Sequence, residues 1–176
     1  VGPGQLAYIY FTSGSTGEPK GAMCEHAGML NHLYAKIEDL EIGAGQVVAQ
    51  TAPQCFDISM WQLVSALLAG GRTLIVEQDV ILDVARFVDT IEAGRVNVLQ
   101  IVPSYLEVVL SYLDQHPREL PDLRYVSVTG EALKRELNHL VELPLAERRE
   151  YMGEQASRAD VILHGGAILA EILDSV

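Results

Sequence analysis

Short apolar runs alternate with segments of helical periodicity along the first three quarters of this chain, and this alternation constrains the fold most. The runs are rich in β-branched residues and apolar on both faces, which is typical of strands buried in a parallel sheet. Strands that alternate with amphipathic helices predict βαβ units, and so an α/β fold with a mostly parallel sheet and flanking helices. The predicted strands are residues 6–12, 46–52, 73–76, 97–102 and 124–129.

The predicted helices lie between these strands. Apolar residues recur at helical spacing from Leu30 to Leu40 and again around Ile91, while residues 57–68 form a third such segment that ends at a Gly-Gly pair. Pro103 is expected to begin a fourth helix. After residue 133 the alternation stops. We therefore expect one α/β domain over residues 1–137, followed by a mainly α-helical segment over residues 138–176.

Charge and composition exclude several classes of partner. The 176 residues are 49% hydrophobic and carry a net charge of −12, so a folded and highly acidic protein is expected. No cluster of Lys and Arg is present to bind nucleic acid or an anionic membrane, and no apolar run reaches the roughly 18 residues of a spanning helix. Cys24 and Cys55 are far apart and have no CxxC partner, which predicts free thiols in a reducing cytoplasm.

The stretch YIYFTSGSTGEPKGAM, residues 8–23, has the composition of an anion-binding loop. Flexible glycines expose backbone N–H groups, hydroxyl side chains add donors, and Lys20 supplies one positive charge. It is not a Walker loop, because Glu18 and Pro19 separate the last loop glycine from Lys20. A polar turn between two strands remains the alternative. The five histidines lack the spacing of a metal site, and we predict none.

These residues resemble the phosphate-loop signature of adenylate-forming enzymes, and in particular of amino-acid adenylation domains in nonribosomal peptide synthetases. Two further stretches match that family in the same order: QCFDISMWQLVSALLAGG at residues 54–71 and LRYVSVTGEAL at residues 123–133. The resemblance covers about residues 1–137.

The resemblance implies that ATP and an amino acid react, with Mg²⁺, to give an aminoacyl adenylate and pyrophosphate. The aminoacyl group would then pass to a carrier protein. Residues implied to hold the phosphates are Thr12, Ser13, Gly14, Ser15, Thr16, Gly17 and Lys20, with Thr12 and Lys20 in the catalytic role, and those implied to pack on adenine are Gly130, Glu131 and Ala132.

Asp57 has two interpretations. From the residues alone it is a helix N-cap before ISMW, or a buried carboxylate that needs a partner. The resemblance implies that Asp57 pairs with the α-ammonium group of the amino acid, and both roles are compatible. By the same resemblance the side-chain pocket consists of Ile58, Trp61, Gln100, Ser127 and Thr129, although helical periodicity alone makes Trp61 a core residue. The hydrogen-bonding members predict a polar or small substrate side chain.

Beyond residue 137 the family pattern does not continue. An adenylation domain would be expected to show a Tyr-Gly-Pro-Thr-Glu motif, a ribose-binding aspartate and a catalytic lysine, none of which is found in this chain. Residues 134–176, with LPLAER and RADVI, instead resemble a segment of the exopolyphosphatase and guanosine-pentaphosphate phosphatase family, which suggests a chimera. Two hypotheses follow: a partial adenylating enzyme, or a catalytically inactive α/β scaffold that retains a phosphate-binding loop.

Overall fold

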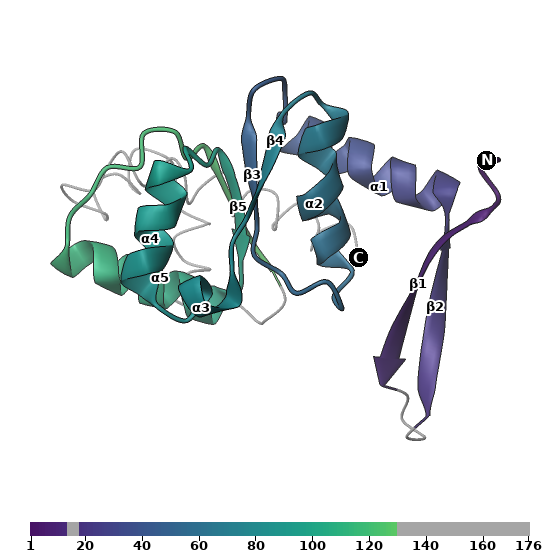
Figure 1. Cartoon of the computed structure of the whole chain (residues 1–176), viewed down its shortest axis with the longest axis horizontal. Helices are drawn as coiled ribbons and strands as arrows, with labels where there is room; N and C mark the ends of the chain where they lie inside the picture. Colours follow the sequence, from purple (N-terminus) through teal and green to yellow (C-terminus); the bar gives the residue numbers. More distant parts are fainter. Residues whose placement is uncertain (14–17, 130–176) are drawn as a thin grey trace, which may run out of the picture.

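The computed structural model describes residues 1–13 and 18–129. Within this part, a four-stranded parallel sheet lies between two layers of helices, and a two-stranded antiparallel hairpin projects to one side (Figure 1). The predicted α/β class with a mostly parallel sheet is confirmed. The predicted helical segment over residues 138–176 lies outside the described residues.

The parallel sheet has the strand order β4-β3-β5-β6. Every residue of β3, β5 and β6 is buried, which explains why these runs are apolar on both faces. Each predicted strand of this sheet is confirmed, and its ends lie within two residues of those expected. The strands are β3 Val47–Gln50, β4 Arg72–Ile75, β5 Val98–Ile101 and β6 Tyr125–Val128.

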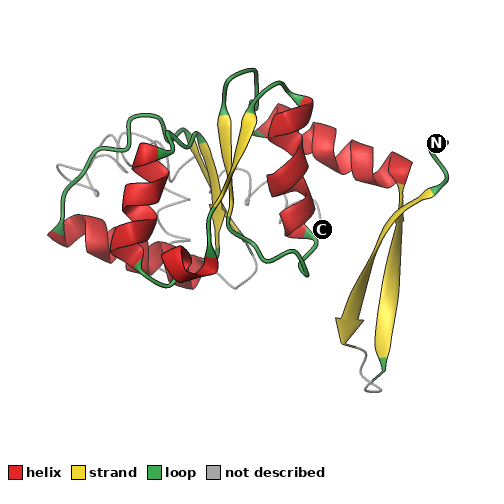
Figure 2. Ribbon diagram, in the orientation of Figure 1, coloured by secondary structure: helices red, strands yellow, loops and turns green. Residues whose placement is uncertain are grey.

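Two helices cover one face of this sheet and three cover the other (Figure 2). On the first face, Trp61 packs with Val48 and Val98; on the second, Phe87 packs with Val47 and Leu99. Because neighbouring residues of a strand point to opposite faces, one strand supplies both cores. The helices are α1 His26–Asp39 and α2 Ile58–Leu68 on the first face, and α3 Gln78–Ile81, α4 Val84–Ala93 and α5 Pro103–Gln115 on the second.

The chain changes direction across the sheet between β3 and β5. After β3 it passes through α2 to the edge strand β4, and then crosses through α3 and α4 to β5 on the other side of β3. Adjacent parallel strands whose connections leave to opposite faces form a topological switch point, and a crevice opens there at the carboxyl ends of the strands. Ligands of open α/β proteins bind in this crevice.

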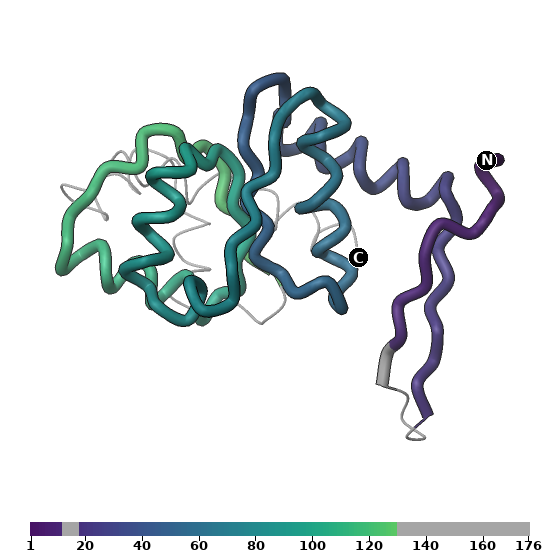
Figure 3. Tube along the Cα trace, in the orientation of Figure 1, coloured from purple at the N-terminus to yellow at the C-terminus, as the bar shows by residue number. Residues whose placement is uncertain are grey.

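The first predicted strand belongs to the hairpin and not to the parallel sheet. β1, Leu6–Ser13, pairs with β2, Pro19–Glu25, so the strand was predicted correctly but its place in the parallel sheet was wrong. Its apolar residues are not core residues: Phe11 is 71% exposed, and Met23, which pairs with Ile9 from β2, is 75% exposed. The hairpin stands beside the helical layer of α1 (Figure 3).

Local polar contacts determine where α4 begins. Asp83 accepts hydrogen bonds from the backbone N–H groups of Ala85 and Arg86 at 3.1 and 3.2 Å, as an N-cap does.

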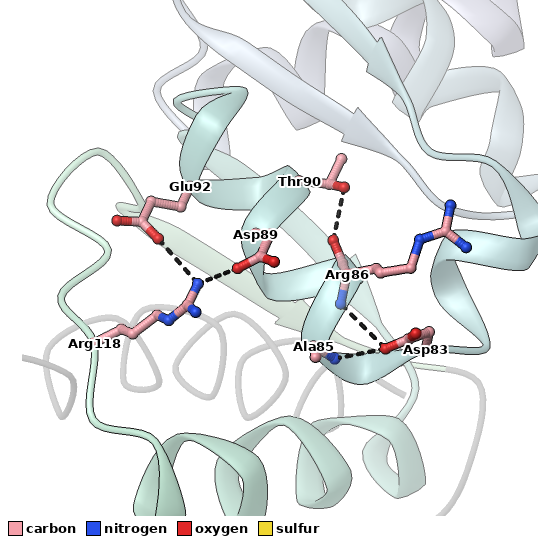
Figure 4. A network of polar contacts seen from close by, with 7 residues as sticks. All are labelled: Asp83, Ala85, Arg86, Asp89, Thr90, Glu92 and Arg118. Atoms are coloured by element: carbon pink, nitrogen blue, oxygen red, sulfur yellow. Dashed lines mark hydrogen bonds and ion pairs between the residues drawn. The ribbon is translucent and has the colours of Figure 1, made fainter.

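Later on the same helix, Asp89 and Glu92 both pair with Arg118, which follows α5 (Figure 4). These exposed ion pairs join α4 to the segment that follows α5 and contribute little to stability. Among the described residues, no helix is long and apolar enough to cross a membrane.

Candidate functional site

A cavity of about 510 Å³ lies at the switch point, beside the carboxyl ends of β3, β5 and β6. The N-terminus of α2 borders it on one side, and α3 to α5 supply its aromatic and aliphatic wall. The described residues that line it are Thr51, Ala52, Pro53, Phe56, Asp57, Ile58, Ile81, Phe87, Gln100, Ile101, Val102, Tyr105 and Thr129. The residues come from three strand ends and four helices or their flanks, so only the folded chain brings them together.

Asp57 lies at the rim of this cavity and caps α2. Its Oδ1 accepts the backbone N–H of Ile58 at 2.8 Å, so the capping interpretation is confirmed. The carboxylate is exposed, and the expectation that it is buried in an apolar environment is wrong. The reason is its position in the loop after β3, where the chain turns at the edge of the sheet. Two carboxylate oxygens have room for several donors, so capping leaves capacity for an ammonium group.

Four of the six predicted substrate residues line the same cavity: Asp57, Ile58, Gln100 and Thr129. The structure does not place the other two in that lining. Trp61 is 2% exposed, lies in the core on the α1 and α2 face, and borders a separate small cavity that it shares with Asp57. Ser127 is buried within β6. The substrate-binding role of all six remains a prediction.

Sequence reasoning missed Gln62, which lies in the middle of α2 with no exposed surface. Its Oε1 accepts the backbone N–H groups of Thr51 and Ala52 at 3.1 and 3.0 Å. Its Nε2 lies 3.5 Å from both Gln100 Oε1 and Thr51 Oγ1. The signal was present, because an amide in the apolar run SMWQLVSALL needs a buried partner.

Gln100 continues this network to the cavity. The Thr51 hydroxyl donates to the Gln100 backbone oxygen at 2.7 Å, and Gln100 Nε2 donates to Thr129 Oγ1. The amide chain therefore joins α2 to the ends of β3, β5 and β6. A buried network of this kind fixes the shape of the site, because breaking one bond leaves a polar group unsatisfied.

The opposite wall of the cavity was also missed, and it is held by Tyr105. Its hydroxyl donates to the Ile81 carbonyl oxygen at 2.6 Å, and its ring meets the Phe87 ring edge-on at 5.1 Å between centroids. Burial, with a smaller contribution from the Asp83 carboxylate, raises the pKa of Tyr105 to about 12. The phenol is therefore neutral at physiological pH, and it positions α5 against α3.

The predicted phosphate loop is described only at its two ends. Thr12 on β1 pairs with Lys20 on β2, and Ser13 pairs with Pro19, so the hairpin closes directly before the loop. The Lys20 side chain is exposed. The remaining predicted cofactor residues lie outside the described residues: Gly14, Ser15, Thr16, Gly17, Gly130, Glu131 and Ala132.

An open parallel sheet with a partly polar cavity at its switch point is typical of α/β proteins that bind small ligands. The comparison with protein families gives the particular class. Residues 1–144 match the sequence model of the AMP-binding enzymes, and the chain belongs to this family.

Several of the curated relatives are synthases much longer than this chain. The chain is 36% identical over 137 residues to one of the proteins that make up mycosubtilin synthase in Bacillus subtilis, an alignment that covers 75% of this chain and 5% of that protein. It is 38% identical over 137 residues to a component of linear gramicidin synthase in Brevibacillus parabrevis, covering 78% of this chain and 2% of that protein. The chain therefore spans only a small part of these relatives.

Solved structures share the fold. The adenylation domain AlmE of Vibrio cholerae, crystallised with glycyl-adenosine-5'-phosphate, is 28% identical with a TM-score of 0.67, over 78% of this chain and 26% of that one. The AMPPNP-bound nonribosomal peptide synthetase FmoA3 is 21% identical with a TM-score of 0.68, over 78% of this chain and 14% of that one. The chain is thus a partial AMP-binding domain of the kind found in these synthetases.

These comparisons give no support to the resemblance of residues 134–176 to the exopolyphosphatase family, or to a chimera. The family match continues to residue 144, beyond the expected boundary at residue 137. Residues 130–176 lie outside the described part of the chain, and the division at residue 137 remains a prediction.

Proposed function

We propose that this chain is the amino-acid-binding and phosphate-binding part of an adenylation domain. The proposed reaction joins an amino acid to the AMP moiety of ATP and releases pyrophosphate, and a carrier protein receives the aminoacyl group. One observation carries the proposal: Asp57 stands at the rim of the switch-point cavity together with Ile58, Gln100 and Thr129. An exposed carboxylate at the mouth of a mainly apolar cavity suits a ligand with an ammonium group and a side chain to bury.

The proposed amino acid binds with its α-ammonium group at the second oxygen of Asp57 and its side chain in the cavity. The volume of about 510 Å³ has room for more than a small side chain. Of the two expected kinds of substrate side chain, polar or small, Gln100 and Thr129 then favour a polar one. We assign no pocket role to Ser127 or Trp61 beyond the expectation stated for them.

Thr12 and Lys20 are proposed to bind the triphosphate of ATP, with the loop between them. The fit rests on the donor set: β1 and β2 pair at Thr12 and Lys20, which places a hydroxyl residue opposite the ammonium-bearing residue where the loop begins and ends. ATP would supply the activated adenylyl group when it is bound, and fixed donors would stabilise the charge that develops on the leaving pyrophosphate. Mg²⁺ is expected with ATP, and no residue of this chain is assigned to hold it.

A second candidate is a scaffold that binds ATP or an amino acid without turnover. The free thiols of Cys24 and Cys55 agree with the proposed cytoplasmic location.

Asp57→Asn tests the proposal sharply, because Asn caps a helix as well as Asp does but has no charge. The full chain is measured for amino-acid binding by calorimetry and for amino-acid-dependent exchange of labelled pyrophosphate into ATP. We expect Asp57→Asn to keep the melting temperature and to lose about tenfold or more in amino-acid affinity. Asp83→Asn, at the N-cap of α4, is the matched control and should leave affinity unchanged.

Lys20→Ala separates the two candidates. Exchange that is present in the unaltered chain and lost in Lys20→Ala supports the enzyme. Amino-acid binding without any exchange supports the scaffold. If no proteinogenic amino acid binds the unaltered chain, the proposed amino-acid site is wrong. It is also wrong if Asp57→Asn binds the amino acid as tightly as the unaltered chain does.

A further inference from the structure

The buried amides behind the cavity form a chain with a single hydrogen-bond direction. We propose that Gln62 is a positioning residue that sets this direction, so that Thr129 presents a hydroxyl donor to the cavity. The site would then select amino acids whose side chain carries an acceptor oxygen at this point. This inference rests on the proposed function, because it names the substrate class of the same site.

The direction begins at two backbone groups. Gln62 Oε1 faces the N–H groups of Thr51 and Ala52, at 3.1 and 3.0 Å. A backbone N–H can only donate, so the atom that faces it must be the amide oxygen of Gln62. The alternative orientation would bring the two N–H groups against an NH₂ group in a place with no exposed surface. The orientation of the Gln62 amide is therefore determined by two backbone N–H groups, which can only donate.

The next step follows from the other end of the same amide. Gln62 Nε2 is a donor only, and it faces Gln100 Oε1 and Thr51 Oγ1, each at 3.5 Å. Thr51 can accept there because its own proton goes to the Gln100 backbone oxygen at 2.7 Å. Gln100 must likewise present its oxygen to Gln62. The two amides thus point the same way.

The last step brings the direction to the cavity. With its oxygen turned to Gln62, Gln100 has its NH₂ group toward Thr129, and Nε2 donates to Thr129 Oγ1. Thr129 Oγ1 is then an acceptor toward Gln100, so its proton is left for a different partner. Both Gln100 and Thr129 line the cavity, and Gln100 is 4% exposed, so water competes poorly for these bonds.

The consequence is a cavity wall that offers donors. The Thr129 hydroxyl and the second N–H of Gln100 both suit an oxygen acceptor such as a carbonyl, carboxamide or sulfoxide. A side-chain ammonium group would meet donors and pay the cost of desolvation. A purely apolar side chain of the same size would leave the donors unsatisfied.

A matched ligand series tests the selectivity on the full chain. L-methionine sulfoxide and L-methionine differ by one acceptor oxygen, and L-lysine is a donor-only side chain of similar length. We expect calorimetry to show at least about tenfold tighter binding of the sulfoxide than of methionine, with lysine weakest. Equal affinities for sulfoxide and methionine, or tighter binding of lysine, would overturn the proposal.

Three variants locate the origin of the selectivity. Thr129→Val should remove the preference for the sulfoxide while methionine still binds. Gln62→Met keeps the length of the side chain but removes both ends of the amide, and we expect the preference to fall although residue 62 does not line the cavity. Ser65→Ala is the control, because Ser65 is a buried polar residue of the same helix that donates only to the Trp61 carbonyl oxygen. A fall in preference for Ser65→Ala equal to that for Gln62→Met would show a general packing effect and contradict the proposal.

A spectroscopic measurement separates failure of this inference from failure of the proposed function. If no amino acid binds at all, the proposed function is wrong, and the amide direction is still measured by NMR of the unliganded chain. The side-chain NH₂ resonances of Gln100 should shift in Thr129→Val and not in Ser65→Ala. Resonances of Gln100 that do not respond to Thr129→Val would overturn the direction itself.

Discussion

Tyr105 shows how one side chain can link the site to the stability of the molecule. Its hydroxyl donates to the Ile81 carbonyl oxygen at 2.6 Å while its ring forms part of the cavity wall. Burial raises the pKa of this phenol from 10.0 to about 12. Because the folded state holds the proton more tightly than the unfolded state, its contribution to stability is complete below pH 10. That contribution is lost as the pH rises from 10 through 12.

Tyr105→Phe is therefore expected to have two effects. Loss of the hydrogen bond should lower the free energy of unfolding by about 1 kcal/mol at pH 8. Between pH 10 and 12 the variant should lose stability less steeply than the unaltered chain. Some loss should persist, because hydrogen bonding to Cys24, followed by burial, raises the pKa of Tyr8 to about 12. Urea unfolding at pH 8, 10 and 11 measures both effects, and parallel curves for the two proteins would contradict the assignment.

Single residues also show what the sequence could predict about the site. Asp57, Ile58, Gln100 and Thr129 were predicted and lie on one cavity. Gln62 was missed because a pattern of polarity does not reveal which way a buried amide faces or what it touches. That information depends on the backbone N–H groups of Thr51 and Ala52, which lie next to α2 only after β3 has joined the sheet.

At the scale of elements, the connection from α2 to β4 depends on a glycine whose neighbours are backbone atoms. Gly71 donates to the Ala66 carbonyl oxygen at 2.7 Å as the chain leaves the helix. A Cβ at this position would lie 2.5 Å from the Gln46 carbonyl oxygen and 3.2 Å from that of Ala66. Neither carbonyl can move without disturbing the start of β3 or the end of α2.

Gly71→Ala should consequently destabilise the protein by about 1–3 kcal/mol, the usual cost of forcing extra atoms into a packed site. Gly43→Ala is the comparison, since a Cβ there meets no atom within 4 Å. We expect the melting temperature of Gly43→Ala to stay close to that of the unaltered chain and that of Gly71→Ala to fall by several degrees. Equal melting temperatures for the two variants would mean that the connection is not tightly packed.

The strands of the parallel sheet and β1 were predictable but the second strand of the hairpin, β2, was not, for a physical reason. β3, β5 and β6 are buried on both faces, so burial itself selects the apolar pattern that identifies them. β2, with the sequence PKGAMCE, is exposed at all but one residue and includes a proline and a glycine. Without a buried face it has no hydrophobic period, so only its pairing with β1 reveals it as a strand.

At the scale of the whole molecule, the hairpin and the layered domain differ in how they are held. The backbone bonds near the base of the hairpin run from His26 and Ala27 to the carbonyl oxygens of Gln5 and Pro3, each 2.9 Å long. Further out, the Tyr10 hydroxyl lies 3.4 Å from Ser59 Oγ. The apolar face that includes Phe11 and Met23 is exposed within the described part of the chain. The hairpin therefore has far less buried surface than the sheet.

Hydrogen exchange should reflect this difference. Regions with few buried contacts open at lower free energy than the global unfolding step. We expect amides of β1 and β2 to exchange well before those of β3 and β5 in the same sample at neutral pH, and the Val48 and Leu99 amides to be among the slowest. Equal protection of the hairpin and the central strands would show that another part of the protein covers the hairpin.

The hydrogen-bond chain from Thr51 through Gln62 and Gln100 to Thr129 has a consequence for redesign. A library that varies Gln100 and Thr129 but keeps Gln62 samples only cavities in which Gln62 Nε2 donates toward position 100. The effects of substitutions at positions 62, 100 and 129 on ligand preference are therefore not additive. Exchanging a single position between relatives would bring two hydrogen-bond donors face to face. Altering the preference of this site requires the hidden helical position to be varied together with the two that the ligand touches.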